Sequence, residues 1–495
     1  VSSTIGNPVF FGGFLAMSLP ILLAKVLLPP RESTQIWDNP IVTLGLLCFG
    51  MAMLFVTLSR GAWLGTAIAF SVVLYFRIKG RRELPRRVPY WFFIILLGVI
   101  LGAFLGVFIA RSGTPRVLDA MRSPHSLESR VEIWKSSLHM ISDRPLSGYG
   151  LDQTEDWFSH YTTEKLARME NALHDRAHNI YLQWGIDGGA LLLLAQLWLF
   201  IYVITRGVRS LGQNRDHIVI GFIGAIAGYL VQGVTGIATN ELSTFLWFVL
   251  GSTVAITSKE KMRNVGFQIA KSPVIERIIV SSLVPLAILA IFPLAAEARY
   301  SAPAREARET INKTAFRNAY RAGRYCSVQP YYQYHLARSC LIFARKREDV
   351  HYAKLAVKVA KRGLKYAPDN AQLLYMLGSS YLTTAQLTGD EEELRLAGIY
   401  LDRARRKAPL FLGTYDDLLE FYIQKGDYGE ALKCADFVSS IDGRDAAVYV
   451  ARSVIYQLRG KDDKAQELFK KASALDPEAE KIKKRLIKAS KFSNR

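Results

Sequence analysis

Three residues in the first 180 positions have side chains suited to chemistry on a charged substrate: Arg60, Arg130 and His178. An arginine side chain is a permanently charged, planar fork that binds the oxygen atoms of a phosphate in a bidentate manner. A neutral histidine accepts a proton near neutral pH. Together, two arginines and a histidine can hold a diphosphate group and activate a hydroxyl, provided that the chain brings the three side chains to one place.

Both arginines also have a structural interpretation. Arg60 lies in a turn between two apolar segments, where an arginine can contact lipid headgroups instead of a substrate. Arg130 begins a stretch, 130–138, that is predicted to form an amphipathic helix on the membrane surface, where it would be solvated. Neither arginine is assigned to a site by its local sequence alone.

The histidine has a more specific local context. His178 ends a long polar loop, and Asn179 is a plausible N-cap for the apolar helix that follows. The positive end of that helix disfavours an imidazolium, so we expect a neutral His178 that can act as a base. The alternative is a structural histidine at the interface. His160 and His174 are rival candidates in the same loop.

The first part of the chain has the composition of a series of membrane-spanning helices, each needing about 20 apolar residues. The candidate spans are 8–28, 41–59, 62–76, 89–110, 180–204, 217–238, 242–257 and 277–296. The second and third are joined at Ser59–Gly61, which predicts a tight hairpin. Since the chain opens directly into an apolar stretch, we expect further spans upstream of Val1.

The charges of the short loops predict the direction of the spans. Lys and Arg dominate three loops, 77–87, 205–216 and 258–276, which are therefore expected to be cytoplasmic. Alternation then places the Ser59–Gly61 turn, loop 111–177 and everything after residue 296 on the external face. Loop 111–177 agrees, because its nine basic and ten acidic residues carry no retention signal. Arg60, Arg130 and His178 would thus share one side of the membrane.

The overall composition excludes some classes of function. The chain has 63 Lys and Arg against 43 Asp and Glu, a net charge of +20, but the excess lies beside apolar runs and indicates topology, not nucleic-acid binding. Four cysteines without metal-site spacing predict no metal centre. Cys326 and Cys340 either form a disulfide in an external, oxidising region or are two buried residues on separate helix faces.

The second half of the chain contains a 34-residue period. Gly443 lies 34 residues after Pro409 and 34 before Pro477, and the step from Pro368 to Pro409 is longer, which predicts an insertion near 388–393. Alanine stands twelve residues before each of these four positions, at Ala356, Ala397, Ala431 and Ala465. Two turns, at Lys425-Gly426-Asp427 and Arg459-Gly460-Lys461, have the same spacing.

This pattern resembles the tetratricopeptide repeat over residues 330–477, with a degenerate capping unit expected in 300–330. The alternative is a generic helical bundle. The resemblance implies a surface that binds a protein partner. The predicted fold is all-α, with a transmembrane helix bundle of about eight spans in 1–296 and an external α-solenoid in 297–495.

Several short motifs of the first half occur in a familiar order. They are Gly6-Asn7-Pro8, Leu58-Ser59-Arg60-Gly61-Ala62, Arg130 with Trp134, Pro145 to Gly150, and His178-Asn179-Ile180-Tyr181-Leu182 with Asp187 and Gly189. In this order, residues 1–257 resemble the O-antigen ligase and polymerase superfamily. Two positions depart from the pattern: Asp187 stands where glutamate is usual, and Leu192 replaces a usual glycine.

The resemblance implies a function. Such proteins transfer a glycan from a polyprenyl diphosphate carrier to a hydroxyl of a lipid or another glycan, on the external face of the cytoplasmic membrane, without metal or nucleotide. Carried over, Arg60 and Arg130 would hold the diphosphate and His178 would deprotonate the acceptor hydroxyl. The implied supporting residues are Asn179, Tyr181, Trp134 and Asp187. No cofactor is expected.

Other functions stay open from the sequence. A non-catalytic anchor that presents the repeats to an envelope assembly would leave the arginines and the histidine scattered. A transporter would place ionisable groups within the spans, which are nearly free of them. Ligase, polymerase and protein O-glycosylation share the same donor chemistry, so the sequence does not separate them.

Overall fold

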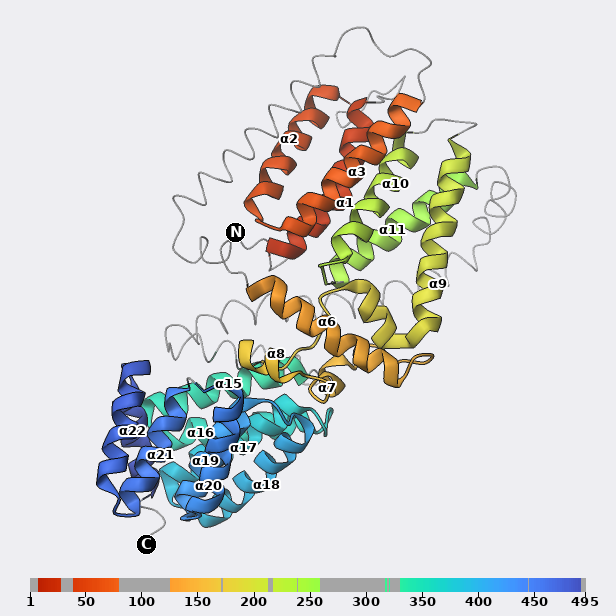
Figure 1. Ribbon diagram of the computed structural model, residues 1–495. Helices are drawn as coiled ribbons and strands as arrows, with labels where there is room; N and C mark the ends of the chain where they lie inside the picture. Colours follow the sequence, from red (N-terminus) through yellow and green to blue (C-terminus); the bar gives the residue numbers. More distant parts are fainter. Residues whose placement is uncertain are drawn as a thin grey trace. The chain divides into compact units, whose positions relative to one another are not determined.

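The computed structural model describes residues 8–27, 39–79, 125–170, 172–211, 217–237, 239–258, 317, 320, 330–443 and 445–490. All regular elements within these ranges are α-helices (Figure 1), which confirms the all-α prediction for the described part of the chain. Contacts between residues divide the chain into two compact units, 1–152 with 176–276 and 153–175 with 277–495.

The first unit contains the apolar helices. They are α1 (Pro8–Leu27), α2 (Pro40–Val56), α3 (Arg60–Lys79), α9 (Ile180–Ser210), α10 (His217–Gly233) and α11 (Asn240–Thr257), with the amphipathic α6 (His125–Asp143) between α3 and α9 in the chain. Among the described residues, α1, α3 and α9 are long and apolar enough to cross a membrane, whereas α2, α10 and α11 are shorter apolar helices. The predicted spans 89–110 and 277–296 lie outside the described residues.

Small residues hold the centre of this unit together. An added Cβ on Gly65 of α3 would lie 2.7 Å from the carbonyl oxygen of Gly228 on α10, and one on Gly228 would lie 2.5 Å from that of Ala16 on α1. The three backbones therefore touch without intervening side chains, which is how helices associate where lipid removes the hydrophobic driving force. This packing fixes the end of α3 that carries Arg60.

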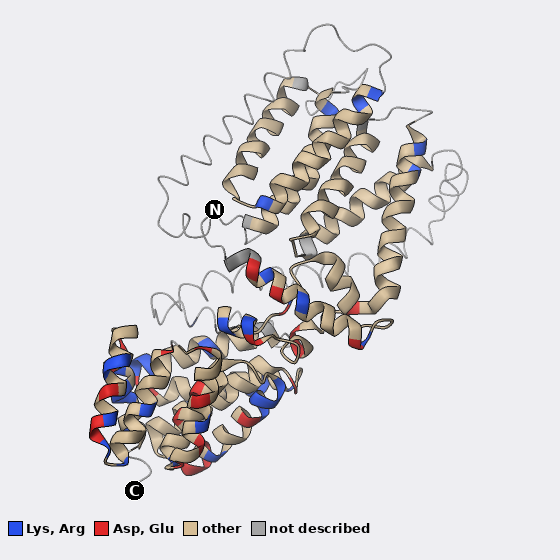
Figure 2. Cartoon of the chain, in the orientation of Figure 1, with Lys and Arg blue, Asp and Glu red and all other residues tan. Residues whose placement is uncertain are grey.

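The charged residues of α1 and α3 lie only at helix ends (Figure 2). The last turns of α1, α3 and α9 carry Lys25, Arg77 with Lys79, and Arg209, and these ends lie at one side of the unit (Figure 1). Arg60 begins α3 at the other side. Arg60 thus lies apart from the basic helix ends, and the direction of the helices across the membrane stays a prediction.

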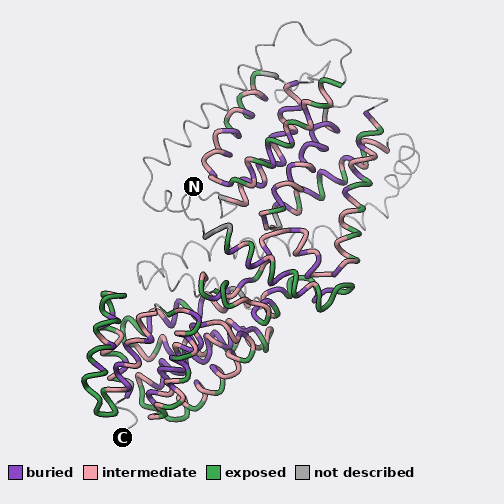
Figure 3. The backbone as a smooth tube through the Cα atoms, viewed as in Figure 1, coloured by how far each residue is buried: buried purple, intermediate pink, exposed green. Residues whose placement is uncertain are grey.

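The second unit is a consecutive array of helices. It contains α15 (Pro330–Arg347), α16 (Val350–Leu364), α17 (Ala371–Thr388), α18 (Glu391–Lys407), α19 (Leu412–Lys425), α20 (Tyr428–Ile441), α21 (Ala446–Leu458), α22 (Asp462–Leu475) and α23 (Ala479–Ser490). Each helix packs on the next, and the odd-numbered helices also pack on one another. The helices share a hydrophobic core, and Figure 3 shows buried residues along the helices of this unit.

The positions with 34-residue spacing have the expected local structure. Ala356, Ala397 and Ala431 are fully buried and Ala465 nearly so. Gly426 and Gly460 both have a positive φ, at the turns between α19 and α20 and between α21 and α22. The longer step before Pro409 arises because α17 and α18 are 18 and 17 residues long, whereas α19 and α20 have 14 each.

Part of the long loop folds with this array and not with the apolar helices. Its segment 153–175 contains two short helices, α7 (Thr154–Phe158) and α8 (Glu164–Met169). The hydroxyl of Ser159 donates to the carbonyl of Lys407 (2.7 Å), and Nε of Arg168 donates to the carbonyl of Ile441 (2.5 Å). The loop is thereby attached to the carboxyl ends of α18 and α20.

The predicted boundary between 1–296 and 297–495, and most of the capping unit expected in 300–330, lie outside the described residues and stay predictions. Cys326 also lies outside them. Its candidate partner Cys340 is a free cysteine, fully buried in α15, which favours the alternative of a buried residue over the disulfide.

Candidate functional site

The turn before Arg60 is closed by its own polar groups. The hydroxyl of Thr57 donates to the carbonyl of Leu54 (2.6 Å), and the backbone N–H of Ser59 donates to the hydroxyl of Thr57 (3.3 Å). The indole N–H of Trp63 donates to the same Leu54 carbonyl (2.9 Å). These bonds confirm the tight hairpin and leave the Arg60 side chain exposed at the first position of α3.

Arg130 lies on α6 and is electrostatically coupled to Arg60. Burial lowers the pKa of Arg130, and the positive charge of Arg60 lowers it further. Two guanidinium groups that repel each other across a short distance are stabilised by an anion placed between them. The pair therefore favours binding of a phosphate-like group, and both residues belong to the first unit.

Helix α6 also carries polar atoms without a partner. The stretch predicted as an amphipathic helix over 130–138 is helical and extends over the whole of α6. Within the described part of the chain, the indole N–H of Trp134 and the buried hydroxyls of Ser129 and Ser136 make no hydrogen bond. Buried donors normally find an acceptor, so α6 has unused hydrogen-bonding capacity beside Arg130.

The backbone holds His178 in a strained conformation. Its φ is +52°, in the left-handed region that a non-glycine residue rarely adopts. On one side, the amide of buried Ala177 donates to Oε1 of Gln183 (3.0 Å). On the other, Oδ1 of Asn179 accepts from the amides of Tyr181 and Leu182, which confirms the predicted N-cap. Such strain occurs mainly where the surroundings fix a residue for a task.

Gln183 links this backbone to Asp187. Its Nε2 donates to Oδ1 of Asp187 (2.8 Å) while its Oε1 accepts from Ala177. One amide side chain thus ties the residue before His178 to the first turns of α9. Sequence reasoning missed Gln183, although a buried glutamine four residues before an aspartate in an apolar helix is an unusual pattern.

Helix α9 is kinked directly after Asp187, where Gly188 and Gly189 leave the helical conformation. The turn between Pro145 and Gly150, one of the motifs of the resemblance, docks against this kink. The amide of Gly150 donates to the carbonyl of Asp187 (2.9 Å), and the amide of Ala190 donates to that of Pro145 (2.7 Å). The kink thereby connects the carboxyl end of α6 to the helix that follows His178.

Leu192, which replaces a usual glycine, packs at the kink. An added Cβ on Gly188 would lie 2.5 Å from the Leu192 side chain. The leucine therefore covers the open side of Gly188 and fills space next to the docked turn.

Two of the predicted supporting residues have structural contacts. The Tyr181 hydroxyl donates to the carbonyl of Leu230 (2.8 Å) and so attaches the start of α9 to α10. Asp187 contributes both its side chain and its carbonyl to the contacts of the kink. Each orders the surroundings of His178.

The rival histidines belong to the other unit. His174 is buried against Phe158, with ring centroids 5.5 Å apart, and burial lowers its pKa. His160 is exposed beside Trp157, and partial burial followed by the charge of Lys407 lowers its pKa. His178 belongs to the same unit as Arg60 and Arg130, which favours it over both rivals.

Within the described ranges, no three His, Cys, Asp or Glu side chains gather closely enough to bind a metal ion. The charges of Arg60 and Arg130 interact, and α6, which carries Arg130 and Trp134, packs against α9, which begins two residues after His178. These parts of the first unit contain guanidinium, imidazole, indole and hydroxyl groups. This set suits an anionic substrate with a reacting hydroxyl.

Comparison with known proteins agrees with this chemistry. No curated protein matches the chain. Residues 44–197 contain the hairpin at Arg60, helix α6, the loop and the amino-terminal half of α9. These residues match the model of the O-antigen ligase family, so this part of the chain is similar to membrane proteins of glycan transfer in polysaccharide assembly.

Proposed function

We propose that this protein transfers a glycan from a polyprenyl diphosphate carrier to an acceptor hydroxyl on the external face of the cytoplasmic membrane. The observation that carries the proposal is the coupled pair Arg60 and Arg130, two guanidinium groups close enough for one to lower the pKa of the other. The family match over residues 44–197 supports the same class of reaction.

In the proposed reaction, the acceptor oxygen attacks the anomeric carbon of the donor glycan. The bond between that carbon and the diphosphate oxygen breaks, and the diphosphate leaves with the bonding electrons. Arg60 and Arg130 stabilise the charge that develops on the leaving group. His178 takes the proton of the acceptor hydroxyl. Trp134 supplies an N–H beside Arg130, and Asn179, Tyr181 and Asp187 hold the backbone around the histidine.

The proposal covers ligases and polymerases alike, because both use this donor chemistry and differ in the acceptor. We further propose that helices α15–α23 are tetratricopeptide repeats that bind a protein partner. The 34-residue spacing of buried alanines and of turn glycines supports this interpretation. Packing of segment 153–175 on the array supports an external location, because that segment is continuous with the loop that ends at His178.

A transfer assay with purified full chain tests the proposal. The donor is a lipid-linked glycan from the source cells, and the acceptors are lipid and glycan fractions offered separately. His178→Ala should lower transfer by about 10²–10⁴-fold, the usual contribution of a positioned acid–base group. Arg130→Lys should also lower transfer, because lysine keeps the charge and loses the bidentate fork.

Two matched controls accompany these variants. His139→Ala removes an exposed histidine of α6, and Arg209→Lys changes an exposed arginine in the last turn of α9. Both should transfer at the parent rate. If His178→Ala and Arg130→Lys do so as well, the membrane half is an anchor for the array and not an enzyme.

A further inference from the structure

The second unit contains a cavity of about 740 Å³ between segment 153–175 and the inner helices α15, α17 and α19. Its volume falls in the range of small-ligand sites, roughly 300–1,000 Å³. The amide of Asn370, at the start of α17, donates to Oε1 of Glu155 (3.1 Å) and to Oδ1 of Asp156 (3.3 Å). These bonds fix the loop side of the cavity.

Aromatic and hydrogen-bonding groups line the cavity together. Tyr334, Tyr375 and Phe411 contribute rings, and Tyr375 meets Phe411 edge to face with centroids 5.1 Å apart. Arg338 and Gln372 contribute donors and an amide acceptor from the neighbouring helices. Ring faces attract C–H groups through their negative quadrupole, whereas the polar groups suit hydroxyls.

Carboxyl groups line the cavity from two sides, and the one on the helix side has a raised pKa. Glu155 and Asp175 line the cavity from the loop, and Asp416 lines it from α19. Burial raises the pKa of Asp416 to about 8, helped by the charges of Asp445 and Asp417. At neutral pH the Asp416 carboxyl is therefore mostly protonated, so it can both donate and accept hydrogen bonds, as a hydroxyl-rich ligand requires.

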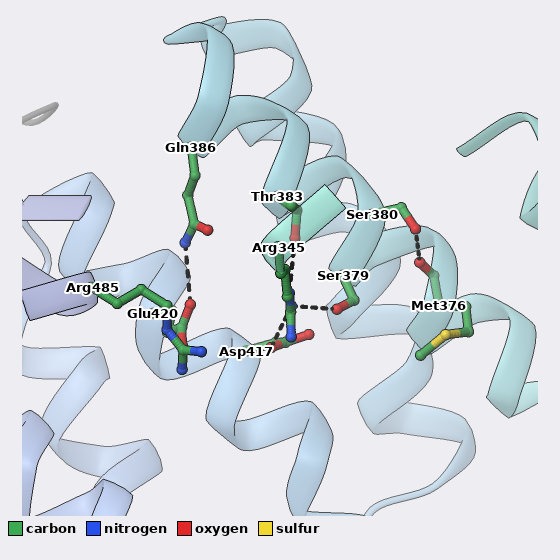
Figure 4. Close-up of polar contacts among 9 residues, drawn as sticks. All are labelled: Arg345, Met376, Ser379, Ser380, Thr383, Gln386, Asp417, Glu420 and Arg485. Carbon is green, nitrogen blue, oxygen red and sulfur yellow. Dashed lines mark hydrogen bonds and ion pairs between the residues drawn. The ribbon is translucent and has the colours of Figure 1, made fainter. Parts of the chain in front are cut away.

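Hydrogen bonds hold one wall of the cavity. Arg345 lines the cavity from α15, and Figure 4 shows its guanidinium reaching Ser379 and Thr383 of α17 and Asp417 of α19. These bonds link three helices and so preorganise the wall, which lowers the cost of binding.

The cavity is also close to the proposed site along the chain. Only two residues separate Asp175 from His178, so their Cα atoms are at most about 11 Å apart in a fully extended chain.

We propose that this cavity binds a saccharide segment of the glycan that the protein transfers or extends. The inference rests on the proposed function, which supplies the glycan. The mixture of rings with amide, guanidinium and carboxyl groups favours a sugar, whose C–H faces and hydroxyls alternate around one ring. A peptide bound by the array would instead need a row of apolar anchor pockets.

Hydrogen exchange of the full chain in detergent tests the proposal. The probe is a set of oligosaccharides released by mild acid from the surface polysaccharide of the source cells, with dextran of equal size for comparison. The probe should protect segment 153–175 together with α15, α17 and α19. Ala172→Trp, which fills the cavity from its exposed loop position, should abolish this protection.

The matched control is Ala474→Trp, at an exposed position of α22. In this variant the probe should still protect segment 153–175 and the three helices. Gln372→Ala, which removes one hydrogen-bonding group, should weaken binding by about threefold to tenfold. Exchange without the probe shows whether each variant is folded. Absence of protection in the folded parent, equal protection in Ala172→Trp, or protection by a pool of ten-residue peptides but not by the probe would each overturn the proposal.

The two proposals can fail separately. If the parent and the His178→Ala variant both bind the probe and neither transfers glycan, the cavity proposal stands and the proposed function is refuted. A parent that transfers glycan yet shows no protection would retain the function and refute the cavity. In Ala172→Trp, the acceptor KM should rise while kcat at saturation stays near the parent value, because the variant leaves the proposed base intact.

Discussion

Gly148 lies so close to Gly189 that an added Cβ on Gly148 would be 2.7 Å from the amide nitrogen of Gly189. Both glycines have a positive φ, +61° and +63°. Their contact joins the turn after α6, which carries Arg130, to the kink of α9, which follows His178. The relative placement of the proposed phosphate-binding residue Arg130 and the proposed base His178 therefore depends on both of these contact positions being glycine.

Replacement of Gly148 by alanine should separate these elements. The left-handed conformation costs a non-glycine residue about 1–2 kcal/mol, and the new methyl group would also lie 2.4 Å from the carbonyl oxygen of Ile186. We expect a lower midpoint of thermal unfolding and reduced glycan transfer. Gly45→Ala in α2 is the control, because its Cβ would meet no atom within 4 Å. Equal behaviour of the two variants would contradict the prediction.

Gln183 should act as a positioning residue for His178. Gln183→Ala removes the acceptor for the Ala177 amide and the donor to Asp187. A displacement of about 1 Å at a reacting group costs roughly 10²-fold in rate, so kcat should fall by about that factor while the donor KM changes little. Gln196→Ala, in the same helix, should leave both parameters unchanged. A large rise in KM without loss of kcat would argue against positioning.

Removing only one partner of the ion pair between Arg345 and Asp417 should strongly lower the stability of the array, whereas removing both should lower it much less. The Asp417 side chain is 6% exposed, and Nη2 of Arg345 lies 3.3 Å from its Oδ1. Arg345→Met leaves a buried carboxylate without its cation, which typically costs about 3–5 kcal/mol. The double variant with Asp417→Leu should recover most of this loss. The free energy of unfolding of the full chain in denaturant, with hydrogen exchange in α15 and α19 as the observable, measures the loss in Arg345→Met and the recovery in the double variant.

Asp416 should make the array more stable in acid than at alkaline pH. Its pKa in the folded chain is about 8, above the ordinary value of 3.8, mainly because of burial. The contribution of protonated Asp416 to the free energy of unfolding is therefore fully present below pH 3.8 and is lost as the pH rises through about 8. Asp416→Asn should flatten this dependence of hydrogen-exchange protection in α19, whereas Asp462→Asn, at an exposed position of α22, should not. A parent whose stability rises between pH 5 and 8 would contradict the prediction.

Features that depend on neighbouring residues in the chain were predictable. The Ser59–Gly61 hairpin, the Asn179 cap and the buried alanines follow from local composition and period, and the structure has all of them. The kink of α9 was not predicted, because it is stabilised by a turn some 40 residues earlier in the chain, at Pro145 to Gly150.

Contacts between distant residues were not predictable. Nothing in the local sequence of Ser159 or Arg168 indicates that these side chains bind the carbonyls of Lys407 and Ile441. Gln183 is a different case, because both of its partners, Ala177 and Asp187, lie within six residues of it in the chain. The shared face of Arg60 and Arg130 is a prediction from topology, but the effect of the Arg60 charge on the pKa of Arg130 depends on the distance between the two side chains, which the local sequence does not determine.

The attachment of segment 153–175 to the array has a consequence for biosynthesis. Ser159 and Lys407 are 248 residues apart, so at 5–20 residues per second the ribosome makes the second roughly 10–50 s after the first. During that interval the buried side chains of the segment have no array to cover them, and the chain between must still be inserted into the bilayer. The nascent protein therefore passes through a stage in which this segment is open to proteases and chaperones.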